Sequence, residues 1–236
     1  ILFAAALTKG VIGFGEGLLA MPLLTLLLGI RASSPLVGLV SAGLTALMLC
    51  ANWQGADLRS AWRVLVGTLL GIPLGVWGLS SLPEVWVTIG LGAVLVLIAL
   101  GQVRRPAART PLAPRWGYAF GLLAGFLSGA YNIGGPPVVI YGSLQRWPPA
   151  KYRSTLQGCF LPACVLRLVG HGVSGLWTPQ VLLLFALSIP AVLAALWLGG
   201  RLSRRVSPQG FERVVYAGLG VLGLMLIVTS LGKLAS

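Results

Sequence analysis

Residues Gly125–Tyr141, with the sequence GFLSGAYNIGGPPVVIY, decide the fold that we predict for this chain. They lie in an uncharged run, Trp116–Gln145, which is long enough to cross a bilayer once or to enter it as two half-helices. Asn132 and the residues Gly134–Pro137 fall in the middle of this run, where an unbroken helix cannot continue. Because backbone at membrane depth must be hydrogen-bonded internally, a break there is tolerated only inside protein or beside a cavity. The stretch therefore predicts a broken membrane helix.

A second stretch near the N-terminus has the same character. Gly10–Pro22, GVIGFGEGLLAMP, interrupts the apolar segment Ile1–Gly29 with closely spaced glycines. Interrupted apolar segments in corresponding positions of two halves are typical of the substrate site of a transporter. One constant offset also aligns Gly10 with Gly129, Gly15 with Gly134, and Asn52 with His171. We therefore predict an internal duplication.

The composition indicates a membrane protein. Of the 236 residues, 57% are hydrophobic and 9% are charged, whereas soluble domains carry about 25% charged residues. A net charge of +13 is typical of proteins that bind nucleic acid. Here, however, most basic residues lie in short loops between apolar runs, as in the cytoplasmic loops of membrane proteins. We therefore expect a multi-pass protein of the cell inner membrane, in contact with lipid and not with nucleic acid. The opening Ile-Leu-Phe lacks a basic region, so we expect no cleavable signal peptide.

The three cysteines lie in apolar runs and form no CxxC pair, so we expect no disulfide, no metal site and no cofactor. Six uninterrupted spans accompany the two broken segments: Ala32–Ala56, Val64–Pro83, Val85–Val103, Ser154–His171, Thr178–Gly200 and Val214–Gly232. We predict a first transmembrane repeat over 1–103, a basic cytoplasmic linker over 104–115 and a second repeat over 116–236.

Charge counting favours one topology. If every apolar segment crossed once, the basic loops 104–115 and 201–205 would fall on opposite sides, and the usual cytoplasmic excess of Lys and Arg would vanish. If each interrupted segment enters and leaves by the same face, only four of the 17 basic residues stay outside: Lys9, Arg31, Arg167 and Lys233. Each repeat is then a re-entrant helical hairpin plus about three transmembrane helices, an odd number of crossings. We therefore predict an all-α membrane protein of two inverted repeats, with the two breaks meeting near the midplane.

The motifs GFGEGLLAMPLL (Gly13–Leu24) and LSGAYNIGGPPVV (Leu127–Val139), in a duplicated chain, resemble those of the TauE/SafE sulfite exporter family. The resemblance covers nearly the whole chain and departs from the family at Glu16, where members often carry a glycine. It implies a secondary transporter that moves sulfite, sulfoacetate or another small sulfur-containing or organic anion across the cytoplasmic membrane, with protons as the coupling ion. It implies a substrate class and not a particular substrate.

The glycine motifs suit an anion for a physical reason. Successive glycines let backbone N–H groups converge, and a half-helix that starts there adds the positive end of its dipole. We predict backbone contacts to the anion from Gly15, Gly17, Gly134 and Gly135, with close helix crossing as the alternative role of any one of them. Asn132 either donates its amide to a sulfite or sulfonate oxygen or only caps the broken helix.

Three ionisable residues in apolar surroundings are further candidates, since such groups are expensive at membrane depth. Glu16 lies in the first break and either carries a coupling proton or forms a structural ion pair with Lys9. Arg167 either binds the substrate or snorkels to the membrane interface. His171, four residues on and on the same helix face, is either a proton relay or a histidine at a loop end.

Other classes of function fit the residues less well. A passive channel for small anions is the main alternative, and its flux would ignore a pH gradient. An enzyme needs a nucleophile with a base, or a metal cluster, and one histidine with four acidic residues supplies neither in a recognisable spacing. A structural subunit without transport is a further alternative, and the sequence is compatible with a homo-oligomer.

Overall fold

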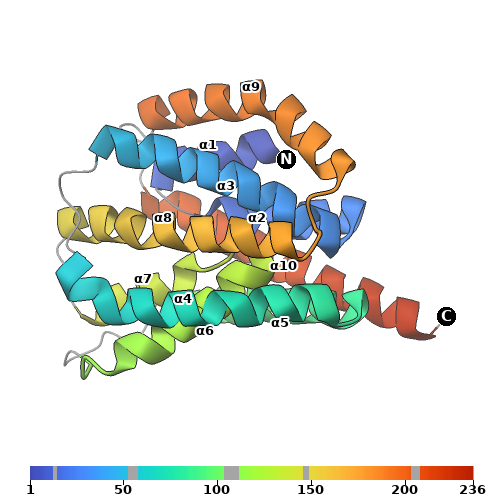
Figure 1. Ribbon diagram of the computed structural model, residues 1–236, viewed down its shortest axis with the longest axis horizontal. Coiled ribbons are helices and arrows are strands. Elements are labelled where there is room, and N and C mark those ends of the chain that lie inside the picture. Colours follow the sequence, from blue (N-terminus) through green and yellow to red (C-terminus); the bar gives the residue numbers. More distant parts are fainter. Residues whose placement is uncertain (13–14, 53–57, 104–111, 146–148, 203–207, 236) are drawn as a thin grey trace. The chain divides into compact units, whose positions relative to one another are not determined.

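The computed structural model describes residues 1–12, 15–52, 58–103, 112–145, 149–202 and 208–235. Within these ranges the chain forms α-helices and no strand, so the predicted all-α class is confirmed. The helices in Figure 1 are α1 Leu2–Ile12, α2 Glu16–Leu28, α3 Ile30–Asn52, α4 Leu58–Ser81, α5 Glu84–Val103, α6 Trp116–Tyr131, α7 Gly135–Leu144, α8 Pro149–Val173, α9 Pro179–Leu202 and α10 Pro208–Ala235.

Four of these helices are long and apolar enough to cross a membrane, which agrees with the predicted class. Their spans are Ile30–Met48, Ala61–Ser81, Glu84–Gly101 and Pro179–Leu202. The predicted breaks are present as well, because α1 ends at Ile12 before α2 begins at Glu16, and α6 ends at Tyr131 before α7 begins at Gly135. The inversion of the second repeat relative to the first stays a prediction.

The helices pack into two compact units, and each unit draws on both halves of the sequence. Unit 1 comprises residues 1–37, 79–106 and 177–236, and unit 2 comprises residues 38–78 and 107–176. Two of the four boundaries between the units fall inside α3 and α4, so a unit is a group of packed helices and is not one of the predicted repeats. The repeat limits and the linker 104–115 stay predictions, and residues 104–111 of that linker lie outside the described ranges.

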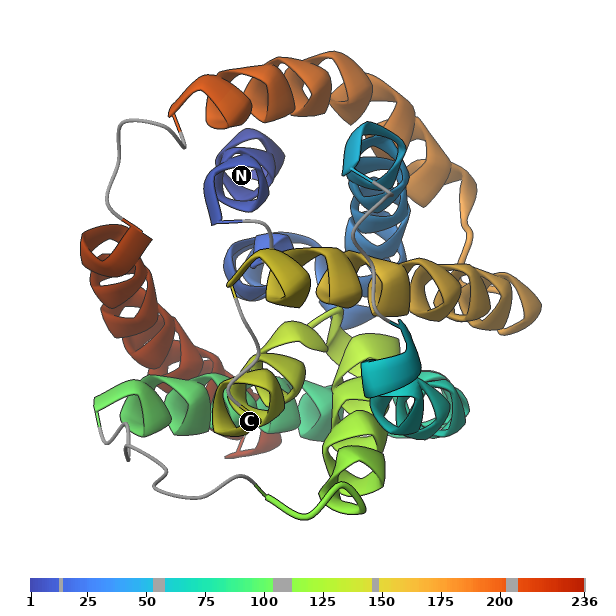
Figure 2. The ribbon, with the colours of Figure 1, turned by 90° about the vertical axis from the view of Figure 1, so that its left-hand side faces the viewer.

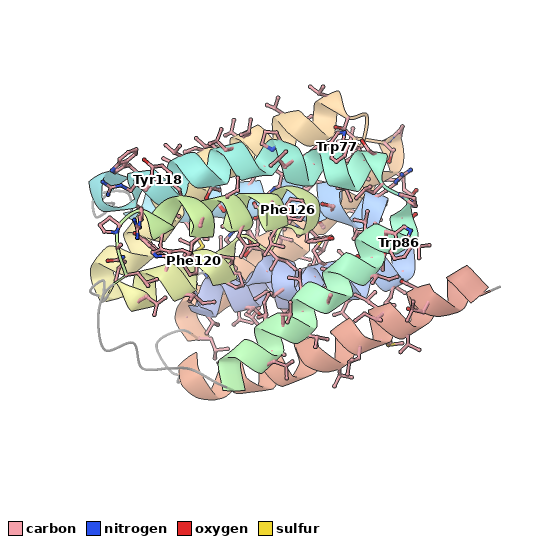
Figure 3. The ribbon with its side chains drawn as sticks, turned by 90° about the horizontal axis from the view of Figure 1, so that it is seen from below. Trp77, Trp86, Tyr118, Phe120 and Phe126 are labelled. Carbon is pink, nitrogen blue, oxygen red and sulfur yellow. The ribbon has the colours of Figure 1, made fainter. Side chains whose placement is uncertain are left out.

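In unit 1, glycines bring pairs of helices together. Helix α1 packs on α9, where a Cβ atom added to Gly10 would lie 3.1 Å from the Cα atom of Gly199 (Figure 1). Helix α5 packs on α10, where a Cβ atom added to Gly92 would lie 2.6 Å from the carbonyl oxygen of Gly223 (Figure 3). Small residues at these contacts let the backbones approach closely, as is usual between helices in a membrane.

In unit 2, α4 and α6 are in direct backbone contact (Figure 2). An added Cβ atom would collide with a backbone carbonyl oxygen of the opposite helix at each position of what we call the glycine ladder: Gly67, Gly71 and Gly75 of α4, and Gly121, Gly125 and Gly129 of α6. Figure 3 shows Tyr118 and Phe126 along α6 beside α4. Another face of α4 is apolar and exposed from Trp62 to Trp77, as expected of a helix that contacts lipid.

Helices α6 and α7 form an antiparallel hairpin around the second break. At its far end, a Cβ atom added to Gly117 would lie 3.1 Å from the hydroxyl of Tyr141, and Gln145 Nε2 donates to the carbonyl oxygen of Leu112 at 2.8 Å. Both outer ends of the hairpin therefore lie together, which is the shape that a re-entrant segment requires. Entry into the membrane from one face stays a prediction.

Candidate functional site

Asn132 forms the turn of the hairpin. Its φ of 57° is the only positive value for a residue other than glycine in the described ranges. The N–H of Asn132 donates to the carbonyl oxygen of Ser128, and the N–H of Ile133 donates to that of Leu127, the paired bonds that commonly end a helix at a left-handed residue. Asparagine tolerates this conformation better than most residues. The backbone of Asn132 therefore acts as the cap that the sequence left as one alternative.

Arg167 lies on α8 with 3% of its surface exposed. Its Nη1 donates to Ser128 Oγ at 2.8 Å, and its Nη2 donates to Cys164 Sγ at 3.4 Å. Its Nε has no hydrogen-bond partner among the residues that the structure describes. The guanidinium group is thus held inside the protein by α6 and α8, so the alternative of an arginine that snorkels to the interface does not describe it.

The charge of Arg167 has no carboxylate beside it in the described part of its unit. Asp57 is the only acidic residue in the sequence of unit 2, and it lies outside the described ranges. A buried charge is costly unless it is paired. A buried guanidinium group with no carboxylate among the described residues of its unit is suited to an anion.

His171 follows Arg167 on the same face of α8 and is fully buried, with 0% exposure. Its Nε2 lies 3.1 Å from the carbonyl oxygen of Gly129 on α6. Its Nδ1 has no hydrogen-bond partner within the described ranges. His171 lies in the last turn of α8, but its full burial does not fit a histidine exposed at the membrane interface, and its role as a proton relay stays a prediction.

The polar atoms of these three residues converge on Gly38 of α3. A Cβ atom added to Gly38 would lie 3.3 Å from Asn132 Oδ1, 3.5 Å from His171 Nδ1 and 3.6 Å from Arg167 Nε. We call this group, together with Ser128, the polar cluster of unit 2. A guanidinium group that is fixed by other bonds and surrounded by amide, hydroxyl and imidazole groups can bind a small oxyanion through charge-assisted hydrogen bonds.

The first break contains an ion pair. Gly15 precedes α2 with a φ of 98°, and Glu16, the first residue of α2, pairs with Lys9 of α1. Both partners are buried, and Lys9 is 2% exposed. The structural pair, one of the two alternatives for Glu16, is therefore present, and a role in proton coupling stays a prediction. Gly13 lies outside the described ranges.

Among the predicted glycines, Gly134 has a packing role in the structure. A Cβ atom added to Gly134 would lie 2.9 Å from the carbonyl oxygen of Ala124 and 2.9 Å from Ser128 Cβ, so Gly134 lets the start of α7 approach α6. Gly135 begins α7, and the two prolines that follow have no N–H group to offer an anion. Gly17 is buried in α2. Contacts from these glycines to an anion stay predictions.

Reasoning from the sequence missed Ser128, Gly38 and the glycine ladder. The ladder has a signal, since glycines recur every fourth residue from Gly67 to Gly75 and from Gly117 to Gly129. Gly38 has no such signal in the sequence, because a single glycine in an apolar run does not indicate which side chains of distant helices it contacts.

Comparisons with known proteins agree with these features. The family described as sulfite exporter TauE/SafE matches residues 1–226. The chain is 28% identical over 241 aligned positions to a protein of Cupriavidus necator named as a probable sulfite/organosulfonate exporter TauE, and the alignment covers 98% of this chain and 93% of that protein. No solved structure matches the chain. The family match spans nearly the whole sequence, so this multi-pass membrane protein belongs to the sulfite exporter TauE/SafE family.

Proposed function

We propose that this protein is a secondary transporter that moves sulfite or a sulfonate across the cytoplasmic membrane, with Arg167 holding the negative charge. The observation that carries the proposal is the buried guanidinium group of Arg167, which has no carboxylate in the described part of unit 2. The printed name of the relative in Cupriavidus necator, a probable sulfite/organosulfonate exporter, supports an anion of this class as the substrate.

The donor groups around Arg167 suit a compact oxyanion. The bonds from Nη1 to Ser128 and from Nη2 to Cys164 fix the plane of the guanidinium group, so little side-chain entropy is lost when an anion binds. The buried setting strengthens each charge-assisted bond because water does not screen it. The amides of Gly134 and Gly135 are proposed as further donors in unit 2, and the amides of Gly15 and Gly17 are proposed as anion donors at the first break in unit 1.

Protons are the proposed coupling ion. His171 is the candidate in unit 2, because its Nδ1 faces the same space as Arg167 Nε. Glu16 is the candidate proton carrier in unit 1. Its ion pair with Lys9 favours a structural role, and a role in proton coupling requires that the pair opens during transport. A passive anion channel remains the alternative, and it would carry the same anions without a response to pH.

The variant Arg167→Gln tests the role of the guanidinium group. We expect the flux of sulfite and sulfoacetate into proteoliposomes to fall about a hundredfold or more, because the loss of a buried charged contact of roughly 3 kcal/mol corresponds to two powers of ten in affinity. Arg201→Gln is the matched control, since Arg201 lies exposed over the ring of Trp197 and should transport normally. Size-exclusion chromatography in detergent checks that both variants fold.

Wild-type flux in the Arg167→Gln variant would contradict the proposed site. The same proteoliposomes separate the two classes of transport: an imposed pH gradient should drive uptake by a proton-coupled transporter, and an anion channel should ignore it.

A further inference from the structure

Residue 38 is glycine, so no side chain of its own fills the space beside the polar atoms of Asn132, Arg167 and His171. Helix α3 carries glycine at position 38, and a methyl group there would already be in contact with the polar atoms of Asn132, Arg167 and His171, at 3.3 to 3.6 Å. Glycine inside a helix is less favourable than alanine, and nothing in the backbone of α3 requires it, because Gly38 has no positive φ. Glycine at this position keeps a side chain away from Arg167 Nε and His171 Nδ1, two buried atoms that have no hydrogen-bond partner within the described ranges.

The tautomer of His171 follows from its partner. The carbonyl oxygen of Gly129, 3.1 Å from Nε2, can only accept a hydrogen bond. Nε2 must therefore carry a hydrogen, and in the neutral imidazole Nδ1 is a bare acceptor that points into the space beside Gly38. Arg167 Nε, which lies close to the same position, is always a donor.

An atom in this space thus meets a donor from Arg167 and an acceptor from His171. A fully ionised oxygen satisfies Arg167 and is repelled by a bare Nδ1. While Nε2 stays bonded to Gly129, His171 Nδ1 becomes a donor only by gaining a proton.

We infer that the anion binds in this space together with one proton, which lies on the hydrogen bond between an anion oxygen and His171 Nδ1. A sulfonate, which stays ionised, requires protonation of His171, whereas hydrogen sulfite brings the proton as its own hydroxyl. Each bound anion then carries one proton with it, and the two ions move as a unit. This inference rests on the proposed function, because it takes Arg167 as the anion's partner.

The surroundings of His171 allow this exchange. Arg167 faces it from the same helix, and the carbonyl oxygen of Gly129 faces it from α6. Gly38 of α3 and the amide of Asn132, which follows α6, lie beside it. Arg167 is the only one of these groups with a charge. Its positive charge disfavours a second positive charge on His171, so the proton is stable only when the negative anion is present. Binding of the two ions is therefore coupled in both directions.

The experiment uses His171 as its own reporter, since it is the only histidine in the chain. The full-length protein, labelled with nitrogen-15 histidine and reconstituted in liposomes, is studied by solid-state NMR at about pH 8, where an ordinary histidine is neutral. Without an anion we expect one protonated nitrogen, Nε2, and one bare nitrogen, Nδ1. With saturating methanesulfonate, which cannot supply a proton, we expect both nitrogens to be protonated.

A neutral imidazole in the methanesulfonate complex would overturn the inference, and so would a proton on Nδ1 in the empty protein. The affinity for methanesulfonate should also fall about tenfold per pH unit above neutral pH, the slope that one linked proton gives. His171→Gln should lose this slope, and a slope that persists in that variant overturns the inference. If only sulfite binds, its affinity should follow the hydrogen sulfite form, and a pH-independent affinity overturns the inference.

Gly38→Ala tests the space itself. The added methyl group should weaken anion binding at least tenfold while the NMR signals of the empty site remain. Gly43→Ala on the same helix is the control, since nothing lies within 4 Å of its added Cβ atom and its binding should match the wild type. Unchanged binding in Gly38→Ala would contradict the site. Failure of wild-type protein to bind any of these anions would instead contradict the proposed function, whereas anion binding that depends on Arg167 without a linked proton contradicts only this inference.

Discussion

At the residue scale, the ion pair between Lys9 and Glu16 spans the first helix break. The pair joins the last turn of α1 to the first residue of α2, and both side chains are buried. Taking two charges out of water is costly, so such a pair often contributes little net stability, but removal of one partner leaves the other charge uncompensated. The effect of Glu16 on stability therefore depends on whether Lys9 is present.

We predict that Glu16→Gln lowers the free energy of unfolding by about 3–5 kcal/mol, because the buried charge of Lys9 loses the carboxylate that it pairs with. The double variant Lys9→Met with Glu16→Leu should recover most of this loss, since two apolar side chains replace the pair. Thermal unfolding in detergent measures both. A double variant as unstable as the single one would contradict the expectation.

The double variant also separates the two roles of Glu16. If the pair is structural, the stable double variant should still accumulate anion in response to a pH gradient in proteoliposomes. If Glu16 carries the coupling proton, that variant should fold normally and lose its response to pH while it still binds the anion.

At the scale of helices, the contact between α4 and α6 depends on the glycine ladder. At Gly71 an added Cβ atom would collide with the carbonyl oxygen of Leu122, and at Gly125 with that of Thr68. These obstacles are backbone atoms, which cannot move aside as a flexible side chain can. The ladder also fixes α6 so that Ser128 and the carbonyl oxygen of Gly129 meet α8.

We predict that Gly71→Ala and Gly125→Ala each lower the free energy of unfolding by about 1–3 kcal/mol, the usual penalty for overpacking, and weaken anion binding as α6 shifts. Gly43→Ala is a matched control in a helix interior, where its Cβ atom meets nothing within 4 Å, so stability there should rise by up to about 1 kcal/mol. Equal thermal stability of Gly71→Ala and Gly43→Ala would contradict the role of the ladder.

The helices and breaks could be predicted from the sequence because their signals are local. Glycine and proline interrupt the apolar runs at Gly15 and at Asn132–Pro137, and these positions coincide with the ends of α1, α2, α6 and α7. The candidate site was predicted only in part. Arg167, His171 and Asn132 are visible as polar residues in apolar runs, but their convergence on Gly38 depends on the packing of α3, α6 and α8, which no local pattern encodes.

At the scale of the whole molecule, the hairpin of α6 and α7 constrains how the chain threads the membrane. Gln145, which follows α7, donates to the carbonyl oxygen of Leu112, which precedes α6, so the segments that flank the hairpin lie at one end of it. An arrangement in which α6 and α7 together cross the bilayer once would place these segments on opposite sides. The contact therefore favours the topology that charge counting predicts, in which the linker 104–115 and the basic residues Arg146, Lys151 and Arg153 share the cytoplasmic side.

Single cysteines in a chain that lacks Cys50, Cys159 and Cys164 test this topology. We predict that cysteines at Arg115 and Lys151 react with a membrane-impermeant maleimide only from the cytoplasmic side, because a re-entrant hairpin returns the chain to the face that it left. Ser174 is exposed and follows α8, which crosses the membrane in this topology. A cysteine at Ser174 should therefore react only from the outer side, and this result serves as the control for the reagent and for the orientation of the vesicles. Labelling of Lys151→Cys from the outside, together with labelling of Arg115→Cys from the inside, would mean that α6 and α7 cross the membrane as one span. That result would contradict both the re-entrant hairpin and the inverted arrangement of the repeats.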